Sequence, residues 1–245
     1  MTVTVLVVQQ EDGAGAGLVG ERLAAEGVRL DVRQPWRGGE LPAGLAGYDG
    51  MVVLGGSAGC RDDGVAPWLG RVRELVREAV RREVPLLGIC LGGQVVADVL
   101  GGAVAPRARG PEVGSVPLRR LPAAESDPVF GAVPDGAPAA QWHFDEIVRL
   151  PAGAVALLGG DDCRYQAFRV GPVAWGTQFH PEVDGDAVAR WAREDAVAVR
   201  AAGGDPEAAV ASVRRDGERL RTVWGTVAGA WGRVVRERAA ADGAR

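Results

Sequence analysis

Residues 84–94 have the sequence Val84-Pro85-Leu86-Leu87-Gly88-Ile89-Cys90-Leu91-Gly92-Gly93-Gln94. The apolar run before Cys90 predicts a buried strand, and the largely apolar residues 95–100 after it predict a helix. Cys90 therefore stands at a tight strand-to-helix corner, where side chains on neighbouring residues would not fit, and Gly88 and Gly92 meet that demand. The helix N-terminus favours a thiolate, which makes Cys90 a candidate nucleophile.

The segments before this corner alternate between strand and helix. Strands are expected at residues 2–8, 28–32 and 48–56, and amphipathic helices at residues 18–26 and 66–80. This order predicts an α/β fold with an open, mostly parallel, flavodoxin-like sheet and helices on both faces. Function gathers at the carboxyl ends of strands in such sheets, which is where Gly55, Gly56 and Cys90 fall.

The second half of the chain predicts more strands and then helices only. Strands are expected within residues 103–121 and at 154–158, 165–170 and 173–179, with residues 122–140 as a surface connection. From Asp184 onward, Ala, Arg, Glu and Val dominate and predict two helices, at residues 186–201 and 206–239. We therefore expect one α/β domain at residues 1–190 and a C-terminal helical extension at residues 191–245.

Composition narrows the possible functions. The chain has 245 residues, 47% of them hydrophobic and 24% charged, as in an ordinary soluble protein, and its net charge of −4 gives no reason to expect nucleic acid as a partner. It contains no lysine. A P-loop lysine, a lysine Schiff base and a lysine general base are therefore excluded.

The N-terminus and the cysteines point to a cytoplasmic protein. The apolar run at residues 2–8 is too short for a signal peptide or a membrane span, so no membrane partner is expected. The three cysteines are odd in number and scattered, which argues against a disulfide framework and for a reducing compartment. No two of them have metal-site spacing, and we predict neither a metal nor a cofactor.

The chain has only two histidines, so the search for a catalytic base is short. His143 is followed two residues later by Asp145, and His180 by Glu182. In extended backbone this spacing puts both side chains on one side, where the acid can orient the imidazole. Either pair could complete a Cys-His-acid triad with Cys90. We prefer His180, because it ends a clearly predicted apolar strand, whereas His143 follows loop-like sequence.

Several motifs in chain order resemble the class I (triad) glutamine amidotransferases, with the closest likeness to the glutaminase domain of GMP synthase and its stand-alone relatives. The motifs are Leu54-Gly55-Gly56-Ser57, Gly88-Ile89-Cys90-Leu91-Gly92-Gly93-Gln94, Gly101-Gly102, Glu112-Val113-Gly114, Trp142-His143-Phe144-Asp145, Gln166-Ala167-Phe168 and Phe179-His180-Pro181-Glu182. The likeness spans about residues 50 to 183 and says little about residues 184–245.

The resemblance implies a role for each matching residue. Cys90 would be the nucleophile, His180 the general base and then acid, and Glu182 the residue that orients it. The backbone N–H groups of Gly56 and Leu91 would form the oxyanion hole. The remaining matches would lie around the substrate: Gln94 and Gly55 near the glutamine, and His143 and Asp145 near the acceptor side or a partner interface.

Two departures from the family pattern concern loop geometry and substrate choice. Many members have His where Gly93 stands, and residues 57–60 replace a loop that more usually contains proline.

Cys60 and Cys163 have neither a strand-to-helix corner nor a metal motif around them and are expected to be packing or surface residues. Glu112 is either a hinge or pocket residue or a solvated carboxylate.

The resulting hypothesis is hydrolysis of the side-chain amide of glutamine, or of a γ-glutamyl compound, through a thioester on Cys90. No ATP-binding motif is present, so the ammonia would pass to a separate synthetase subunit. One alternative is a stand-alone γ-glutamyl peptidase, and another is a catalytically weak regulatory subunit. An α/β-hydrolase with a cysteine nucleophile is disfavoured, because its acid ordinarily precedes the histidine by many residues.

Overall fold

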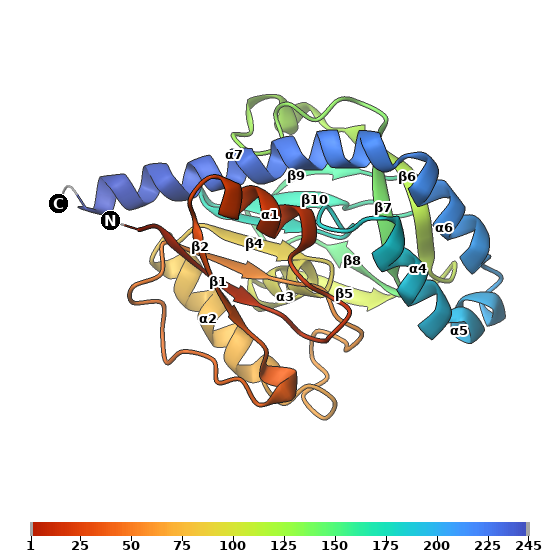
Figure 1. Cartoon of the computed structure of the whole chain (residues 1–245), viewed down its shortest axis with the longest axis horizontal. Helices are drawn as coiled ribbons and strands as arrows, with labels where there is room; N and C mark the ends of the chain where they lie inside the picture. The colour runs from red at the N-terminus through yellow and green to blue at the C-terminus, as the bar shows by residue number, and fades with distance from the viewer. Residues whose placement is uncertain (1, 244–245) are drawn as a thin grey trace.

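A computed structural model describes residues 2–243; Met1, Ala244 and Arg245 lie outside the described residues, at the outer ends of the two expected domains. Its main sheet has the strand order β2-β1-β3-β4-β11-β10-β9-β6-β7 (Figure 1). The first five of these strands are parallel, with bounds Arg29–Arg33, Thr4–Val8, Gly50–Val53, Leu86–Ile89 and Ala174–Thr177. The last four continue antiparallel, with bounds Ala167–Val170, Val155–Gly159, Glu112–Arg120 and Ala137–His143. A separate hairpin-like pair joins β5 (Ala103–Pro106) to β8 (Asp145–Arg149).

The helices of the described residues are α1 (Gly17–Ala25), α2 (Leu69–Arg81), α3 (Leu91–Val99), α4 (Gly185–Glu194), α5 (Ala196–Ala201), α6 (Pro206–Arg215) and α7 (Gly217–Gly243). Short 3₁₀ turns stand at Pro35–Arg37 and Pro122–Ser126. Within residues 2–243, no helix combines the length and the apolar character that crossing a bilayer requires.

Alternate residues of the central strands bury opposite faces of the sheet. On β1, Val5 and Val7 belong to an apolar core shared with α1 and α7, whereas Leu6 and Val8 belong to a second core shared with α2 and α3. All four side chains are at most 1% exposed. This two-sided burial requires near-continuous apolar strands. It confirms the predicted α/β fold with helices on both faces of the sheet.

The C-terminal segment forms four helices rather than the expected two. Asp195 follows the end of α4, and Asp216 separates α6 from α7. The side chain of Asp205 accepts a hydrogen bond from the N–H of Ala208 at 2.9 Å, which starts α6 with an N-cap. The apolar periodicity continues across Asp216, so no local pattern marks that break.

The long helix α7 lies along α1 over one face of the sheet (Figure 1). The ring of Trp224 on α7 packs on Phe179, with 4.4 Å between ring centroids. Two ion pairs, Arg221 with Glu21 and Arg236 with Glu26, join the exposed sides of the two helices. Because Phe179 immediately precedes His180, α7 supports the end of β11 from behind.

The expectation of a surface connection at residues 122–140 was wrong for its last four residues, 137–140, which belong to a strand. β7 begins at Ala137, and every residue of this strand is buried. The strand contains no β-branched residue and includes Pro138, so it lacks the usual strand composition. Pro138 is tolerated because β7 is the last strand of the sheet and faces Pro117 of β6, where neither residue donates to the ladder.

The fold predicts a strong effect of a single methyl group at Gly92. A β-carbon there would lie 2.0 Å from the carbonyl oxygen of Val53, because α3 packs directly on the backbone of β3. We expect Gly92→Ala to lower the free energy of unfolding in urea by about 3 kcal/mol or more. Gly217→Ala is the matched control, since a β-carbon there would meet no atom of the described residues within 4 Å beyond its chain neighbours and its own helix backbone. Its effect should stay within about 1 kcal/mol, and equal effects of the two changes would contradict the packing described.

Candidate active site

Cys90 joins β4 to α3 in a strained backbone conformation, with φ 50° and ψ −108°. Residues other than glycine rarely adopt a positive φ, and holding one there costs about 1–3 kcal/mol. A β-carbon at Gly88 would lie 2.5 Å from the carbonyl oxygen of Gly92, so this residue, like Gly92, must lack a side chain. The predicted corner therefore exists, and it places Cys90 in the wall of a cavity.

His180 and Glu182 follow β11, and His180 lies in the same cavity wall as Cys90, with Glu182 buried behind it. Nδ1 of His180 lies 2.7 Å from Oε1 of Glu182, and the two side chains are only 4% and 1% exposed. The backbone N–H of His180 donates to the carbonyl of Ala140 on β7 at 2.9 Å. A β-carbon on Gly55 would lie 2.9 Å from Cε1 of His180, so the imidazole passes directly over that glycine.

Charge around His180 favours its protonated form. Burial by itself would lower the pKa of His180, but the negative charges of Glu182 and of the Cys90 thiolate, with side-chain hydrogen bonds to both, raise this pKa well above its ordinary value. The imidazole therefore holds a proton next to the sulfur. Such a pair is the arrangement in which a cysteine acts as nucleophile and a histidine as its acid–base partner.

Two backbone donors beside Cys90 are free. The N–H groups of Gly56 and Leu91 make no hydrogen bond to any of the residues 2–243. Leu91 is the first residue of α3, and a β-carbon on Gly56 would lie 3.2 Å from its side chain, so the two residues are neighbours. Free N–H groups at a helix N-terminus favour a negatively charged oxygen.

Gln178 links the sulfur to the residue predicted to bind substrate. Its Nε2 lies 3.9 Å from Sγ of Cys90, and its Oε1 accepts from Nε2 of Gln94 at 3.3 Å. Gln94 also donates to the carbonyl of Asp145 at 3.2 Å. With Nε2 held twice, Gln94 keeps its Oε1 without a partner among the described residues, and its side chain lines the cavity.

His143 lies apart from the triad candidates, in a buried polar cluster. Its Nδ1 donates to the carbonyl of Asp145 at 2.8 Å, and its Nε2 lies 2.8 Å from Oε2 of Glu112. Burial would raise the pKa of Glu112, but hydrogen bonds from His143 and Gln166 and the nearby charge of Arg107 hold it below its ordinary value. Both ring nitrogens of His143 thus face an acceptor, the Asp145 carbonyl on one side and the Glu112 carboxylate on the other. Glu112 is therefore a buried residue and not a solvated carboxylate.

This cluster is also the place where a metal would have to be considered. Donor atoms of Glu112, His143 and Cys163 all lie within 4.8 Å of one another. Burial, followed by the charge of Glu112, raises the pKa of the Cys163 thiol to about 12. A protonated thiol is a poor ligand, and both ring nitrogens of His143 are already engaged. We interpret the cluster as structural. Burial likewise raises the pKa of Cys60 to about 11, as expected of a packing residue.

The cavity has a volume of about 660 Å³. Six of the predicted site residues line it: Cys90, His180, Gln94, His143, Asp145 and Gly56; Glu182, Leu91 and Gly55 do not. Unpredicted residues complete the wall: Glu11, Asp12, Gly13 and Ala14 from the loop after β1, Ser57 and Ala58, Trp142 and Phe144, and Trp191, Glu194, Asp195 and Ala198 from α4 and α5.

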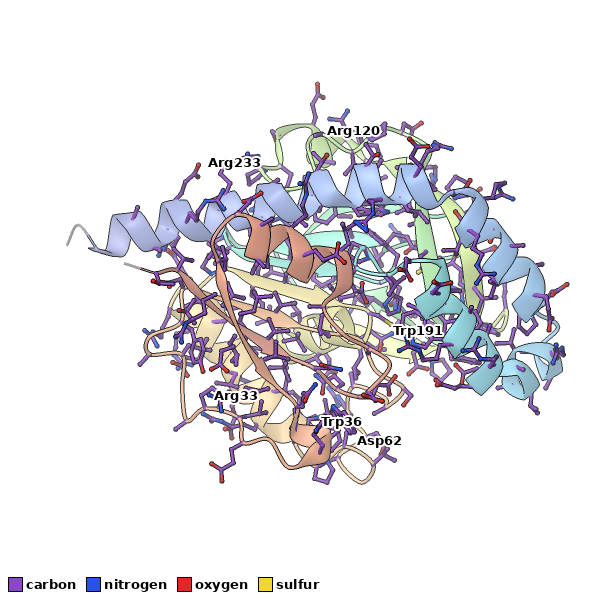
Figure 2. The ribbon with its side chains drawn as sticks, viewed as in Figure 1. Arg33, Trp36, Asp62, Arg120, Trp191 and Arg233 are labelled. Atoms are coloured by element: carbon purple, nitrogen blue, oxygen red, sulfur yellow. The ribbon has the colours of Figure 1, made fainter. Side chains whose placement is uncertain are left out.

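Trp191 is an unpredicted residue that packs directly on His180. It lies on α4 on the side that faces the sheet (Figure 2), and its ring centroid is 4.6 Å from that of His180. A second contact, 6.5 Å between centroids, joins it to Trp142. The helical pattern of residues 186–201 indicated only a face that packs on a core, so nothing local marked Trp191 as part of a cavity.

Residues 19–190 match the family model described as glutamine amidotransferase class-I. One subunit of the glutamine-hydrolyzing GMP synthase of Thermoplasma acidophilum is 32% identical over 142 residues, which is 57% of this chain and 66% of that protein. The chain thus spans just under two thirds of that relative's length.

Relatives outside GMP synthase are similar as well. Gamma-glutamyl peptidase 3 of Arabidopsis thaliana is 29% identical over 141 residues, 55% of each chain. The crystal structure of a glutamine amidotransferase from Thermotoga maritima superimposes with a TM-score of 0.83 and 26% identity, and covers 95% of this chain and 99% of that one. That superposition extends over the C-terminal helices, which the family model does not reach.

The proximity of His180 to the sulfur of Cys90 predicts a histidine pKa that depends on this cysteine. In Cys90→Ser the negative charge and the hydrogen bond at the sulfur are lost, so the pKa of His180 should fall towards its ordinary value. NMR of the protein labelled at histidine Cε1 measures this directly, because the chain has only two histidines. The resonance of His143 is the internal control and should not move. An unchanged His180 titration in Cys90→Ser would contradict the pairing.

Proposed function

The chain belongs to the class I glutamine amidotransferase family, and we propose that it hydrolyses the side-chain amide of glutamine, or of a γ-glutamyl compound, with Cys90, His180 and Glu182 as its catalytic triad. The observation that carries this proposal is the strained corner at Cys90 next to the buried His180–Glu182 pair. Hydrolysis proceeds in two steps, and each triad residue has a separate role in them.

The first step forms a thioester. The Cys90 thiolate attacks the carbonyl carbon of the side-chain amide, and the carbonyl oxygen becomes an oxyanion. The free N–H groups of Gly56 and Leu91 donate to this oxyanion, and such donors are each worth about 10²–10³ in kcat. His180 gives its proton to the amide nitrogen as the C–N bond breaks, so the amine leaves neutral and the γ-glutamyl group stays on sulfur.

The second step releases glutamate. His180, now neutral, removes a proton from water, which attacks the thioester carbonyl; a second oxyanion forms and collapses, and the thiolate leaves. Glu182 fixes the tautomer of His180 through Nδ1 and stabilises the imidazolium that forms in each cycle. Trp191 packs on the ring and restricts its rotation. Gln94 and Gly55 would border the bound γ-glutamyl group.

Two fates of the product amine have separate support. Transfer of ammonia to a separate synthetase subunit is supported by the similarity to single subunits of GMP synthase. Stand-alone hydrolysis of γ-glutamyl compounds is supported by the γ-glutamyl peptidase relative and by the cavity of about 660 Å³. Cavities of about 300–1,000 Å³ hold drug-sized ligands, and this volume is larger than a glutamine alone requires.

His143 and Asp145 would lie on the acceptor side of the bound substrate.

We also propose that residues 191–245 act as a helical extension of the amidotransferase domain at residues 1–190. Support comes from the family match, which ends at residue 190. The segment after it contributes Trp191, Glu194 and Asp195 to the cavity wall.

A cytoplasmic location is proposed from the three cysteines, all of them free and buried.

Replacing the nucleophile should abolish turnover. Cys90→Ser is expected to lower glutamate release from glutamine and from γ-glutamyl peptides by about 10³-fold or more, because a serine hydroxyl is far harder to ionise than a thiol and is a weaker nucleophile here. Release of glutamate and ammonia is measured with each substrate, without a partner protein. Turnover of the peptides alone would favour the stand-alone hydrolase over ammonia transfer.

Cys60→Ser is the matched control, because it places the same hydroxyl in another buried position, 7% exposed. It should retain activity, and both variants should unfold near the wild-type temperature. Full activity in Cys90→Ser would exclude the proposed mechanism. If the wild-type protein turns over nothing and a glutamine-analogue electrophile fails to label Cys90, the chain is a regulatory subunit.

A further inference from the structure

We propose that the cavity selects γ-glutamyl amides whose departing amine carries a second, positively charged group, such as an aminoalkyl amine. This inference rests on the proposed function and adds the class of leaving group. It is carried by the chemistry of the cavity wall beside His180, where tryptophan rings and carboxylates stand together.

His180 marks the side of the cavity on which the leaving group lies. The imidazole must reach the amide nitrogen to protonate it, so whatever is attached to that nitrogen extends from His180 away from Cys90. The ring of Trp191 lies against His180, with 4.6 Å between centroids, and Trp142 lies 6.5 Å from Trp191. The first part of the leaving group would therefore contact indole surfaces, which attract alkyl chains and cations.

Carboxylates continue this wall. Glu194 ends α4, Asp195 follows it, and Glu11 and Asp12 line the cavity from the loop after β1, which approaches Trp191 at Gly13. No arginine of residues 2–243 lines the cavity, and the chain has no lysine. The carbonyl groups at the C-terminus of α4 add partial negative charge at the same place.

Most of this negative charge is not neutralised by the protein. The carboxylates of Asp12, Asp145 and Glu194 make no hydrogen bond or ion pair with any described residue. Asp195 accepts from Nε1 of Trp142 at 2.8 Å, which fixes the carboxylate but leaves its charge. Glu11 is held by the N–H and hydroxyl of Ser57 and likewise keeps its charge.

The other end of the substrate does not need these carboxylates. A γ-glutamyl group carries one ammonium and one carboxylate and is neutral overall, and Oε1 of the buried Gln94, unpartnered among the described residues, is available to it on the Cys90 side. The uncompensated acidic wall is thus left for the leaving group. A cationic tail would be attracted there, and an anionic tail would be repelled.

Three amides of equal chain length test this inference: γ-glutamyl-diaminobutane with a cationic tail, γ-glutamyl-butylamine with a neutral tail, and γ-glutamyl-aminobutanoate with an anionic tail. Glutamate release gives kcat/KM for each. We expect the cationic amide to exceed the neutral one by about tenfold, and the anionic amide to fall below both. The ratio of cationic to neutral should shrink as salt is added.

Charge-removing variants link the preference to this wall. The double variant Asp12→Asn with Glu194→Gln should lower kcat/KM for the cationic amide more than for the neutral one. The double variant Glu218→Gln with Glu237→Gln removes an equal charge from α7, on two exposed residues outside the cavity, and should leave the ratio unchanged. Equal kcat/KM for the three amides, a preference for the anionic one, or an unchanged ratio in the double variant would each overturn the inference.

The same assay separates this inference from the proposed function. Hydrolysis of glutamine and of the neutral amide without a preference for the cation leaves the triad intact and overturns only the selectivity. Absence of turnover with all three amides and with glutamine overturns both proposals.

Discussion

Close contact between backbones at the start of α3 is the constraint on which the active site depends. Helix α3 begins where a β-carbon on Gly92 would overlap the carbonyl oxygen of Val53, and one on Gly88 would overlap the carbonyl of Gly92. Only at this separation does the chain turn sharply enough to hold Cys90 at a positive φ. The same approach leaves the N–H of Leu91 free beside the sulfur. The strain at Cys90 is maintained by the apolar cores on both sides of the sheet, which keep α3 in place.

A chain of polar groups extends from the sulfur to the antiparallel half of the sheet. Gln178 contacts Cys90 and Gln94, Gln94 contacts the carbonyl of Asp145, and that carbonyl also accepts from His143. The ion pair of His143 with Glu112 therefore holds the Asp145 carbonyl, and through it the amide of Gln94, in one orientation. Removing one member of a buried ion pair is far more costly than the pair's net contribution, because the other charge stays behind. The cluster of Glu112 and His143 contains none of the proposed catalytic groups, but it positions Gln94, which would border the substrate.

The parallel half of the fold and the geometry around Cys90 could be predicted, because apolar runs bounded by glycine determine these strands and a glycine-flanked cysteine has few structural alternatives. The two-residue spacing also correctly paired His180 with Glu182, although the backbone at residues 181–182 forms a turn and is not extended. β7 was missed at residues 137–140 because its residues are small and include proline, and its burial comes from tertiary packing. Gln178 was missed because its role depends on Cys90, 88 residues away, and a glutamine is equally compatible with an exposed position.

His180 stands at the junction of two structural units, and this explains how the C-terminal helices affect a site built on the sheet. Its backbone is tied to β7 through Ala140, and its ring lies against Trp191 of α4. Phe179, the residue before it, packs on Trp224 of α7. The ends of parallel strands thus carry the proposed nucleophile and the proposed oxyanion donors, whereas the helices after residue 184 pack on the histidine and form the wall beyond it. In the proposed reaction the histidine contacts both the bond that breaks and the wall that surrounds the leaving group, so helix packing and the choice of leaving group would be coupled through one ring.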